Sequence, residues 1–301
     1  MFQIQSPDDF RAFDSLQHDF EERLPVRRRY SVTGDILSYR RCARQYGHFS
    51  EHNFAPAQAA QLWFGQVIHE TLDRAHRQTR GQIEGKEASI PTDMDIEEYF
   101  VQVSESLIAR GIKPMSGDAK EKALAYLIRF NRQMGDILYP KVQDTEHRLQ
   151  SQSENFVMEG IVDVLVREDG DEDDPSTWEI WDYKASHVPD EDDVDMQNYR
   201  YQMQVYAGLF KKKNGEYPSK AVLYFLVEDD PEQARAEIPF DEERIQQAMA
   251  TFRKTVAEIQ DSRDREEWPT PEETPSKETC DACDIRWDCP IRKDDYPLRT
   301  P

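Results

Sequence analysis

Apolar positions in the first 140 residues recur every three or four residues, which is the period of an amphipathic helix. The clearest run consists of Leu62, Val67, Ile68, Leu72 and Ala75. An earlier helix is expected to begin at Ser31 or Thr33, since both side chains can cap a helix, and to continue through Tyr46. The spacing also predicts a polar loop over 81–94, followed by helices at about 95–110 and 118–137.

After Pro140 the apolar positions take the pattern of strands. The predicted strands cover 146–150, 156–166 and 178–184, and the first two would form a hairpin that turns near Ser153 and Glu154. The remaining elements are a helix over 198–210, strands over 221–227 and 234–239, a helix over 242–260, and a Pro- and Glu-rich linker over 261–279. This succession predicts an α/β core with a helical addition before it.

The composition of the 301-residue chain is that of a polar globular protein, with 38% hydrophobic and 33% charged residues. No stretch of about 18 apolar residues is present, so no membrane span is expected. The first ten residues lack the basic start and apolar stretch of a secretory signal. We therefore expect a cytoplasmic protein that has no membrane partner.

The net charge of −22 counts against a nucleic-acid partner, but the charge is unevenly distributed. Residues 23–90 carry eleven Lys and Arg against six Asp and Glu, whereas 168–174 and 190–195 are strongly acidic. An acid-rich, Lys-poor surface is also typical of proteins from concentrated salt, and in that case the charge reflects the solvent. The arginines that could contact phosphates are Arg27, Arg28, Arg29, Arg40, Arg41, Arg44, Arg74 and Arg77, although each could equally lie on a solvated helix face.

The most informative candidate chemistry is Asp182-Tyr183-Lys184, preceded by Asp163 in an apolar strand. Residues two apart on a strand point to the same face, so Asp182 and Lys184 would lie side by side. Oxygen ligands suit Mg²⁺ or Mn²⁺, which can activate a water, while the lysine orients that water or helps to deprotonate it. Asp-x-Lys alone is a weak signal, because many proteins place such a pair on a solvated strand.

Two further motifs strengthen this interpretation. His69 lies on the predicted helix that follows Gly65 and offers an imidazole ligand, although a helical histidine is more often an ordinary surface or core residue. Gln202 and Tyr206 are four apart on a later helix and therefore share one face. Each motif alone is weak evidence for an active site. Together, however, the motifs follow one another in one order, each on a predicted helix or strand that suits it.

This order resembles the RecB-like nucleases of the PD-(D/E)XK superfamily, whose pattern runs G-x-x-x-H, G-x-x-D, D-Y-K and Q-x-x-x-Y. Here the motifs are Gly65 to His69, Gly160 to Asp163, Asp182 to Lys184, and Gln202 to Tyr206. The resemblance implies a restriction-endonuclease-like α/β core, with a mixed central sheet flanked by helices. It implies one nuclease domain over 31–290, made of a helical part (31–140), a catalytic sheet core (141–260) and a linker with a cysteine tail (261–290), between an extension (1–30) and a tail (291–301).

The same resemblance implies a role for each motif residue. The ligands of the catalytic Mg²⁺ or Mn²⁺ would be the side chains of His69, Asp163 and Asp182 and the carbonyl of Tyr183. Lys184 would act on the water. Gln202 and Tyr206 would line the site and help hold DNA. Glu146, at the start of the first strand, matches a family acidic position only loosely and is left out of the predicted site.

The four cysteines are Cys42, Cys280, Cys283 and Cys289, and a C-x2-C pair in a cytosolic protein favours metal binding or redox chemistry over a structural disulfide. One early and three late cysteines resemble the iron–sulfur branch of these nucleases, which includes AddB-type subunits and CRISPR-associated exonucleases; Ala43 replaces the usual proline. The resemblance implies a [4Fe–4S] cluster that pins the tail to the N-terminal helix. Four thiolates also suit Zn²⁺, and in the remaining alternative the four cysteines are unrelated free thiols.

The implied function is metal-dependent cleavage of DNA, as an exonuclease on single-stranded ends, in repair, recombination or CRISPR adaptation. The segment from Cys42 to His69, with Asn53-Phe54-Ala55-Pro56, also looks like nuclease domains fused to UvrD-like helicases, so a helicase or another recombination or CRISPR protein could be a partner. Two alternatives remain. The chain could be an inactive relative whose iron–sulfur or zinc centre organises a DNA-binding scaffold, or a zinc-stapled regulatory protein.

Overall fold

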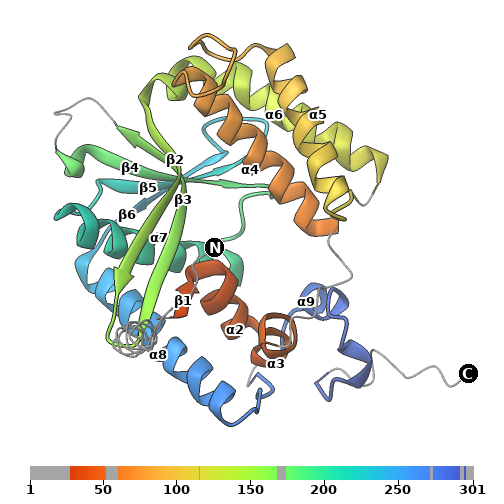
Figure 1. Cartoon of the computed structure of the whole chain (residues 1–301), viewed down its shortest axis with the longest axis vertical. Coiled ribbons are helices and arrows are strands. Elements are labelled where there is room, and N and C mark those ends of the chain that lie inside the picture. The colour runs from red at the N-terminus through yellow and green to blue at the C-terminus, as the bar shows by residue number, and fades with distance from the viewer. Residues whose placement is uncertain are drawn as a thin grey trace, which may run out of the picture.

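A computed structural model describes residues 28–51, 60–114, 116–167, 174–271, 274–291 and 295. A six-stranded mixed sheet forms the middle layer, and helices cover both of its faces (Figure 1). The predicted α/β core with a mixed central sheet flanked by helices is therefore confirmed. In the part of the chain that the structure describes, no helix is both long and apolar enough to cross a membrane.

The strands follow the order β1-β3-β4-β5-β6, with β2 paired to the other edge of β3. Only β1 to β3 and β4 to β5 are parallel pairs. The strand bounds are β1 Arg28–Ser31, β2 Val142–Gln152, β3 Phe156–Arg167, β4 Trp178–Lys184, β5 Lys220–Phe225 and β6 Arg235–Pro239. The predicted hairpin turn is confirmed, because the Ser153 amide donates to the Phe156 carbonyl at 2.8 Å. Strand β1 was not predicted, since four residues carry too little periodicity.

Three helices cover one face of the sheet (Figure 1). They are α4 (Ala60–Thr79), α5 (Asp93–Ala109) and α6 (Gly117–Leu138), and the short helix η3 (Tyr139–Lys141) leads from α6 into β2. A capping box begins α5, in which Thr92 and Asp95 each accept from the other's backbone amide. The apolar faces of these helices bury Trp63 and Phe130 against Trp181 and Tyr224 of the sheet. This packing holds α4, and with it His69, over the sheet.

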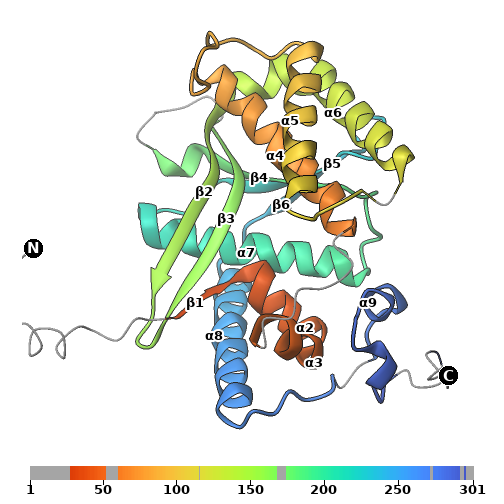
Figure 2. The ribbon, with the colours of Figure 1, turned by 45° about the vertical axis from the view of Figure 1, so that its right-hand side comes forward.

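The opposite face is covered by α7 (Val194–Asn214) and α8 (Glu242–Asp264), which pack on each other (Figure 2). Helix α7 ends at Gly215, whose φ of 91° is a left-handed conformation that glycine adopts without strain. Met203 and Phe210 of α7 are buried with Leu223 of β5 and Phe252 of α8. Because α7 lies directly beneath the sheet, Gln202 and Tyr206 reach the β3–β4 region.

The helix predicted from Ser31 through Tyr46 is broken. It consists of η1 (Val32–Leu37), α2 (Ser38–Arg41), α3 (Ala43–Tyr46) and η2 (Gly47–Glu51). Cys42 interrupts it with extended backbone angles, φ −163° and ψ 102°, and its sulfur accepts from the Gln45 amide as the cap of α3. The prediction of one continuous helix was therefore wrong, and the break turns the Cys42 thiol toward the tail. The remaining short helices are η4 (Pro175–Thr177), α9 (Lys277–Asp281) and η5 (Arg286–Asp288).

Strand β3 changes partners along one of its edges. Its start pairs with β1 as far as Glu159, and its end pairs with β4 from Val164 onward. Between these two points, residues 160–163 have no registered strand partner on that edge of the described sheet, while β2 continues along the other edge. The resulting fork leaves room for side chains between β3 and the end of β4.

Candidate active site

Asp163 lies at this fork. Its Oδ2 accepts a 2.8 Å hydrogen bond from the Tyr183 amide and lies 3.1 Å from Nδ1 of His69 on α4. The Asp163 carboxylate thus accepts from the backbone amide of Tyr183 just beyond the point where the backbone pairing of β3 and β4 ends. The predicted His69 and Asp163 are brought together, although 94 positions separate them in the sequence.

Glu146 completes a group that the sequence prediction did not include. In the β2–β3 register Thr145 faces Val164 and His147 faces Val162, so Glu146 stands opposite Asp163. Its φ of 48° is unusual for a glutamate. One ligand atom each from His69, Glu146 and Asp163 lie within 4.8 Å of one another, which is a spacing suited to a metal ion. Only its place at the start of a strand signalled Glu146, because its register with β3 is not visible in the sequence.

The electrostatics of this group fit a divalent cation. Burial of the Glu146 carboxyl group, with the charge of Asp163 beside it, raises the pKa of Glu146 to about 7, although much of the residue is exposed. Burial lowers the pKa of His69, but the Asp163 charge outweighs this and holds that pKa at about 9. Burial would raise the pKa of Asp163, yet His69 keeps it below its usual value. Desolvated carboxylates that repel one another are what an Mg²⁺ or Mn²⁺ ion would neutralise.

Asp182 and Lys184 point to the same face of β4, as predicted, and pair at 2.5 Å between Oδ2 and Nζ. Nε2 of Gln202 donates to Oδ1 of Asp182 at 3.0 Å and to the Tyr206 hydroxyl at 2.9 Å. Oε1 of Gln202 accepts from Lys184 at 3.2 Å. Asp182 therefore faces the lysine and the amide rather than joining the compact group of His69, Glu146 and Asp163.

The burial of this network sets its charge states. Burial lowers the pKa of Lys184, but the Asp182 carboxylate more than offsets this, so the ammonium is retained. Burial raises the pKa of Asp182, and the charge of Asp163 adds to that rise against the opposing effect of Lys184. The side chain of Tyr183 points to the other face, where its hydroxyl lies 2.8 Å from Nε2 of the buried His76.

The structure gives a packing reason for Gly160. A Cβ at this position would lie 2.6 Å from Cε1 and 2.7 Å from Cδ1 of Tyr206. The tyrosine ring thus occupies the space that any larger residue on β3 would fill. Gly160, Tyr206 and Gln202 form a continuous support beneath Asp182 and Lys184.

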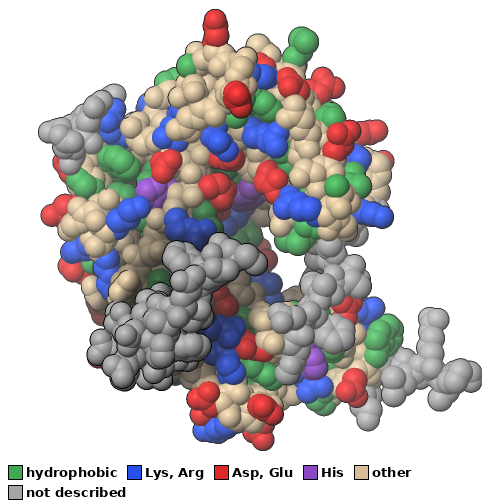
Figure 3. Space-filling view, in the orientation of Figure 1, with side chains coloured by type: hydrophobic (Ala, Val, Ile, Leu, Met, Phe, Trp, Pro, Cys, Tyr) green, Lys and Arg blue, Asp and Glu red, His purple; other side chains and the backbone are tan. Residues whose placement is uncertain are grey.

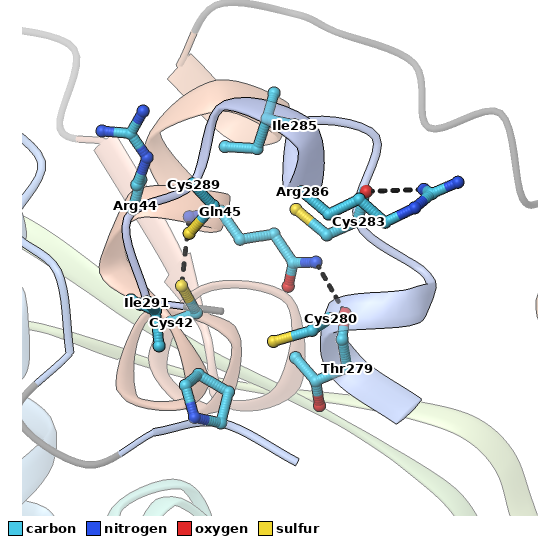
Figure 4. A pocket seen from close by; sticks show the side chains of 11 residues that line it. Cys42, Arg44, Gln45, Thr279, Cys280, Cys283, Ile285, Arg286, Cys289 and Ile291 are labelled. Carbon is cyan, nitrogen blue, oxygen red and sulfur yellow. Dashed lines mark hydrogen bonds between the residues drawn. The ribbon is translucent and has the colours of Figure 1, made fainter. Parts of the chain in front are cut away.

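The four cysteines line one pocket between the α2–α3 break and the tail, as Figure 4 shows. Nε2 of Gln45 donates to the Thr279 carbonyl at 3.4 Å across this pocket. Among the described residues no three cysteine sulfurs lie within 4.8 Å of one another, so they form no compact ligand group. Tetrahedral zinc would hold its sulfurs about 3.8 Å apart, given a Zn–S distance of about 2.3 Å. Burial raises the pKa of Cys42, and the thiols of Cys283 and Cys289 add to that rise.

Comparison with known proteins agrees with the fold. The fold is similar to a crystal structure named "Putative exonuclease" from Eubacterium rectale, with a TM-score of 0.52 and 12% identity over 99% of this chain and 100% of that chain. The crystal structure of SSO0001 matches 94% of this chain and 95% of its own, at 15% identity and a TM-score of 0.40. No curated protein matches. The family model described as the PD-(D/E)XK nuclease superfamily matches residues 31–290, and the chain therefore belongs to that superfamily.

Proposed function

We propose that this protein is a metal-dependent nuclease that hydrolyses phosphodiester bonds in DNA. The observation that carries the proposal is the juxtaposition of two groups at the fork of the sheet. One is the ligand group of His69, Glu146 and Asp163, and the other is the Asp182–Lys184 pair. Buried, mutually perturbed ionisable groups of this kind are typical of active sites.

His69, Glu146 and Asp163 would hold the divalent cation, and the family resemblance adds Asp182 and the Tyr183 carbonyl. When bound, the cation would activate a water and neutralise the charge that develops on the phosphodiester. Lys184 remains protonated beside Asp182, so its Nζ donates hydrogen bonds and orients the attacking water. Gln202 fixes both partners of that pair through its amide, and Tyr206 fixes Gln202.

We propose further that the chain acts as an exonuclease on single-stranded DNA ends, in the RecB-like branch of the superfamily. The similar fold of a protein named as an exonuclease and the motifs from His69 to Tyr206 support this. The predicted pathways are DNA repair, recombination or CRISPR adaptation. The predicted partner is a helicase supplied by another chain. The helicase-like segment at Asn53 to Pro56 lies outside the described residues.

A [4Fe–4S] cluster is our proposal for the four cysteines. They line one pocket, yet their sulfurs are spread more widely than a single zinc ion would hold them. A cluster places an iron between each thiolate and the centre, so it suits a wider ring of sulfurs. Anaerobic purification should give a brown protein with about four iron atoms per chain. Stoichiometric zinc without iron would favour the zinc alternative.

The nuclease proposal is tested by incubating labelled DNA with the full chain and Mg²⁺ or Mn²⁺. Asp163→Asn and Lys184→Ala should each lower the cleavage rate at least about 100-fold, since each removes several kcal/mol of transition-state stabilisation. Asp136→Asn, on an exposed position of α6, is the matched control and should cleave normally. DNA binding without cleavage by the unaltered chain would instead favour the inactive scaffold.

A further inference from the structure

Most arginines of the predicted basic stretch are already engaged within the fold. Acidic and basic side chains are interspersed over the face shown in Figure 3. The ion pairs are Arg28 with Glu51, Arg29 with Glu159, Arg44 with Asp288, and Arg77 with Asp73. Arg80 pairs with Asp144 as well. The other engaged arginines are Arg74, which donates to the side-chain amide oxygen of Gln102, and Arg40, whose guanidinium lies 4.9 Å from the centroid of the Tyr201 ring. Arg27 lies outside the described residues.

Arg41 differs from these neighbours. It is exposed at the end of α2, and within the described residues it has no ion pair, hydrogen bond or ring contact. The guanidinium is therefore available to a ligand without first breaking an internal contact.

Arg41 also lines a cavity of about 360 Å³ that leads to the active site. The cavity lies between η1 and α2 on one side and the first turns of α7 on the other. Lys184 and Gln202, which belong to the catalytic network, line the same cavity. The ring of Tyr199 lines the cavity as well, with its centroid 4.2 Å from Nζ of Lys184.

The volume lies near the lower end of the range for small-ligand pockets, about 300–1,000 Å³. It suits one nucleotide and leaves no space for a base pair. Asp195 and Asn198 line the wall from α7, where they can bond the polar edges of a base. Those edges are free only in an unpaired nucleotide. The charge of Asp195 also disfavours a phosphate on that wall, which leaves the phosphate to Arg41.

We infer that this cavity is the subsite for an unpaired nucleotide next to the scissile bond, with Arg41 binding its phosphate. The inference rests on the proposed function, because it assigns the strand that enters the same active site. Arginine suits this task, since its planar guanidinium donates two parallel hydrogen bonds to phosphate oxygens. Among the described arginines of the basic stretch, Arg41 thus becomes the phosphate contact.

The test is binding of a short fluorescent single-stranded oligonucleotide, measured by anisotropy with a chelator present so that no cleavage occurs. Salt is varied between about 50 and 200 mM, because each phosphate contact on a single strand contributes about 0.7 to the slope of log K against log salt. Arg41→Ala should weaken binding about tenfold at low salt and reduce the slope by about 0.7. Arg41→Lys should keep most of the slope, since the charge remains.

Arg132→Ala is the matched control, because Arg132 is exposed on α6 and pairs with Asp93 far from the cavity. It should leave both the affinity and the slope unchanged. Equal slopes for Arg41→Ala and Arg132→Ala would overturn the subsite, even if the unaltered chain cleaves DNA. An equal loss with a blunt hairpin would overturn the assignment to an unpaired nucleotide.

The two proposals fail separately in these measurements. Binding that depends on Arg41 without any cleavage in Mg²⁺ or Mn²⁺ would refute the nuclease and retain the subsite. Cleavage that does not depend on Arg41 would refute the subsite and retain the nuclease. Failure of the unaltered chain to bind single-stranded DNA would overturn the subsite outright.

Discussion

Substitution of Gly160 by alanine tests whether the site is held by the packing of Tyr206 on β3. The new Cβ would lie 2.6 and 2.7 Å from two ring carbons of Tyr206, and 3.4 Å from Cδ1 of Leu209. Carbon atoms pack favourably at about 3.5–4.0 Å, so the ring must move by about 1 Å. Since Tyr206 is only 3% exposed, its ring cannot simply turn into solvent.

The cost follows from two contributions. Overpacking of a core position costs about 1–3 kcal/mol, and loss of the buried Tyr206–Gln202 hydrogen bond costs about 1 kcal/mol more. We therefore expect Gly160→Ala to lower the free energy of unfolding by about 2–4 kcal/mol. Displacement of Gln202 would also loosen Asp182 and Lys184, and a shift of about 1 Å near reacting groups can cost about 100-fold in rate.

Urea unfolding followed by circular dichroism and tryptophan fluorescence measures the first effect, and initial cleavage rates well below the unfolding temperature measure the second. Gly117→Ala is the matched control, because a Cβ there meets nothing within 4 Å. In a Tyr206→Ala background the added methyl should cost little, since the ring that it strikes is gone. If Gly160→Ala were as stable as Gly117→Ala, or cost as much without the tyrosine, the packing argument would be wrong.

Three further predictions concern the metal group, the linker and a buried histidine. Glu146→Gln should raise the Mg²⁺ concentration for half-maximal cleavage at least about tenfold, and an unchanged titration would exclude Glu146 as a ligand. Gly47→Ala should lower the free energy of unfolding by about 1–3 kcal/mol and shift tryptophan emission, because its Cβ would overlap the Trp268 ring; unaltered stability would contradict this contact. Burial lowers the pKa of His76 from 6.5 to about 3, so only the unfolded chain gains that proton between these pH values. The free energy of unfolding should therefore decrease as the pH is lowered through this range, by up to about 1.4 kcal/mol per pH unit, and His76→Phe should flatten this dependence relative to the unaltered chain.

Much of the local structure could be predicted from the sequence because its signals are local. The period of apolar residues located α4 to α8 and β2 to β6 within a few positions. The two-residue spacing of Asp182 and Lys184 set their common face, and the four-residue spacing of Gln202 and Tyr206 set theirs. These are properties of one strand and one helix, and they hold whatever the chain does elsewhere.

The sequence could not show contacts that depend on how distant elements pair. Glu146 became part of the site only through the register of β2 on β3, and β1 formed because β3 offered it an edge. The break at Cys42 likewise has no signal in the helical spacing.

By itself, then, the sequence determined most of the helices and strands, the order of the motifs and the residue types available for chemistry. The tertiary structure decided which of them meet. It placed Glu146 beside Asp163 and His69, engaged most of the described basic-stretch arginines with neighbours, and left Arg41 facing the cavity. The physical reason is that burial, strand register and charge pairing arise between segments far apart in the chain. Side chains at these places take their pKa and their partners from the packed neighbours rather than from adjacent residues.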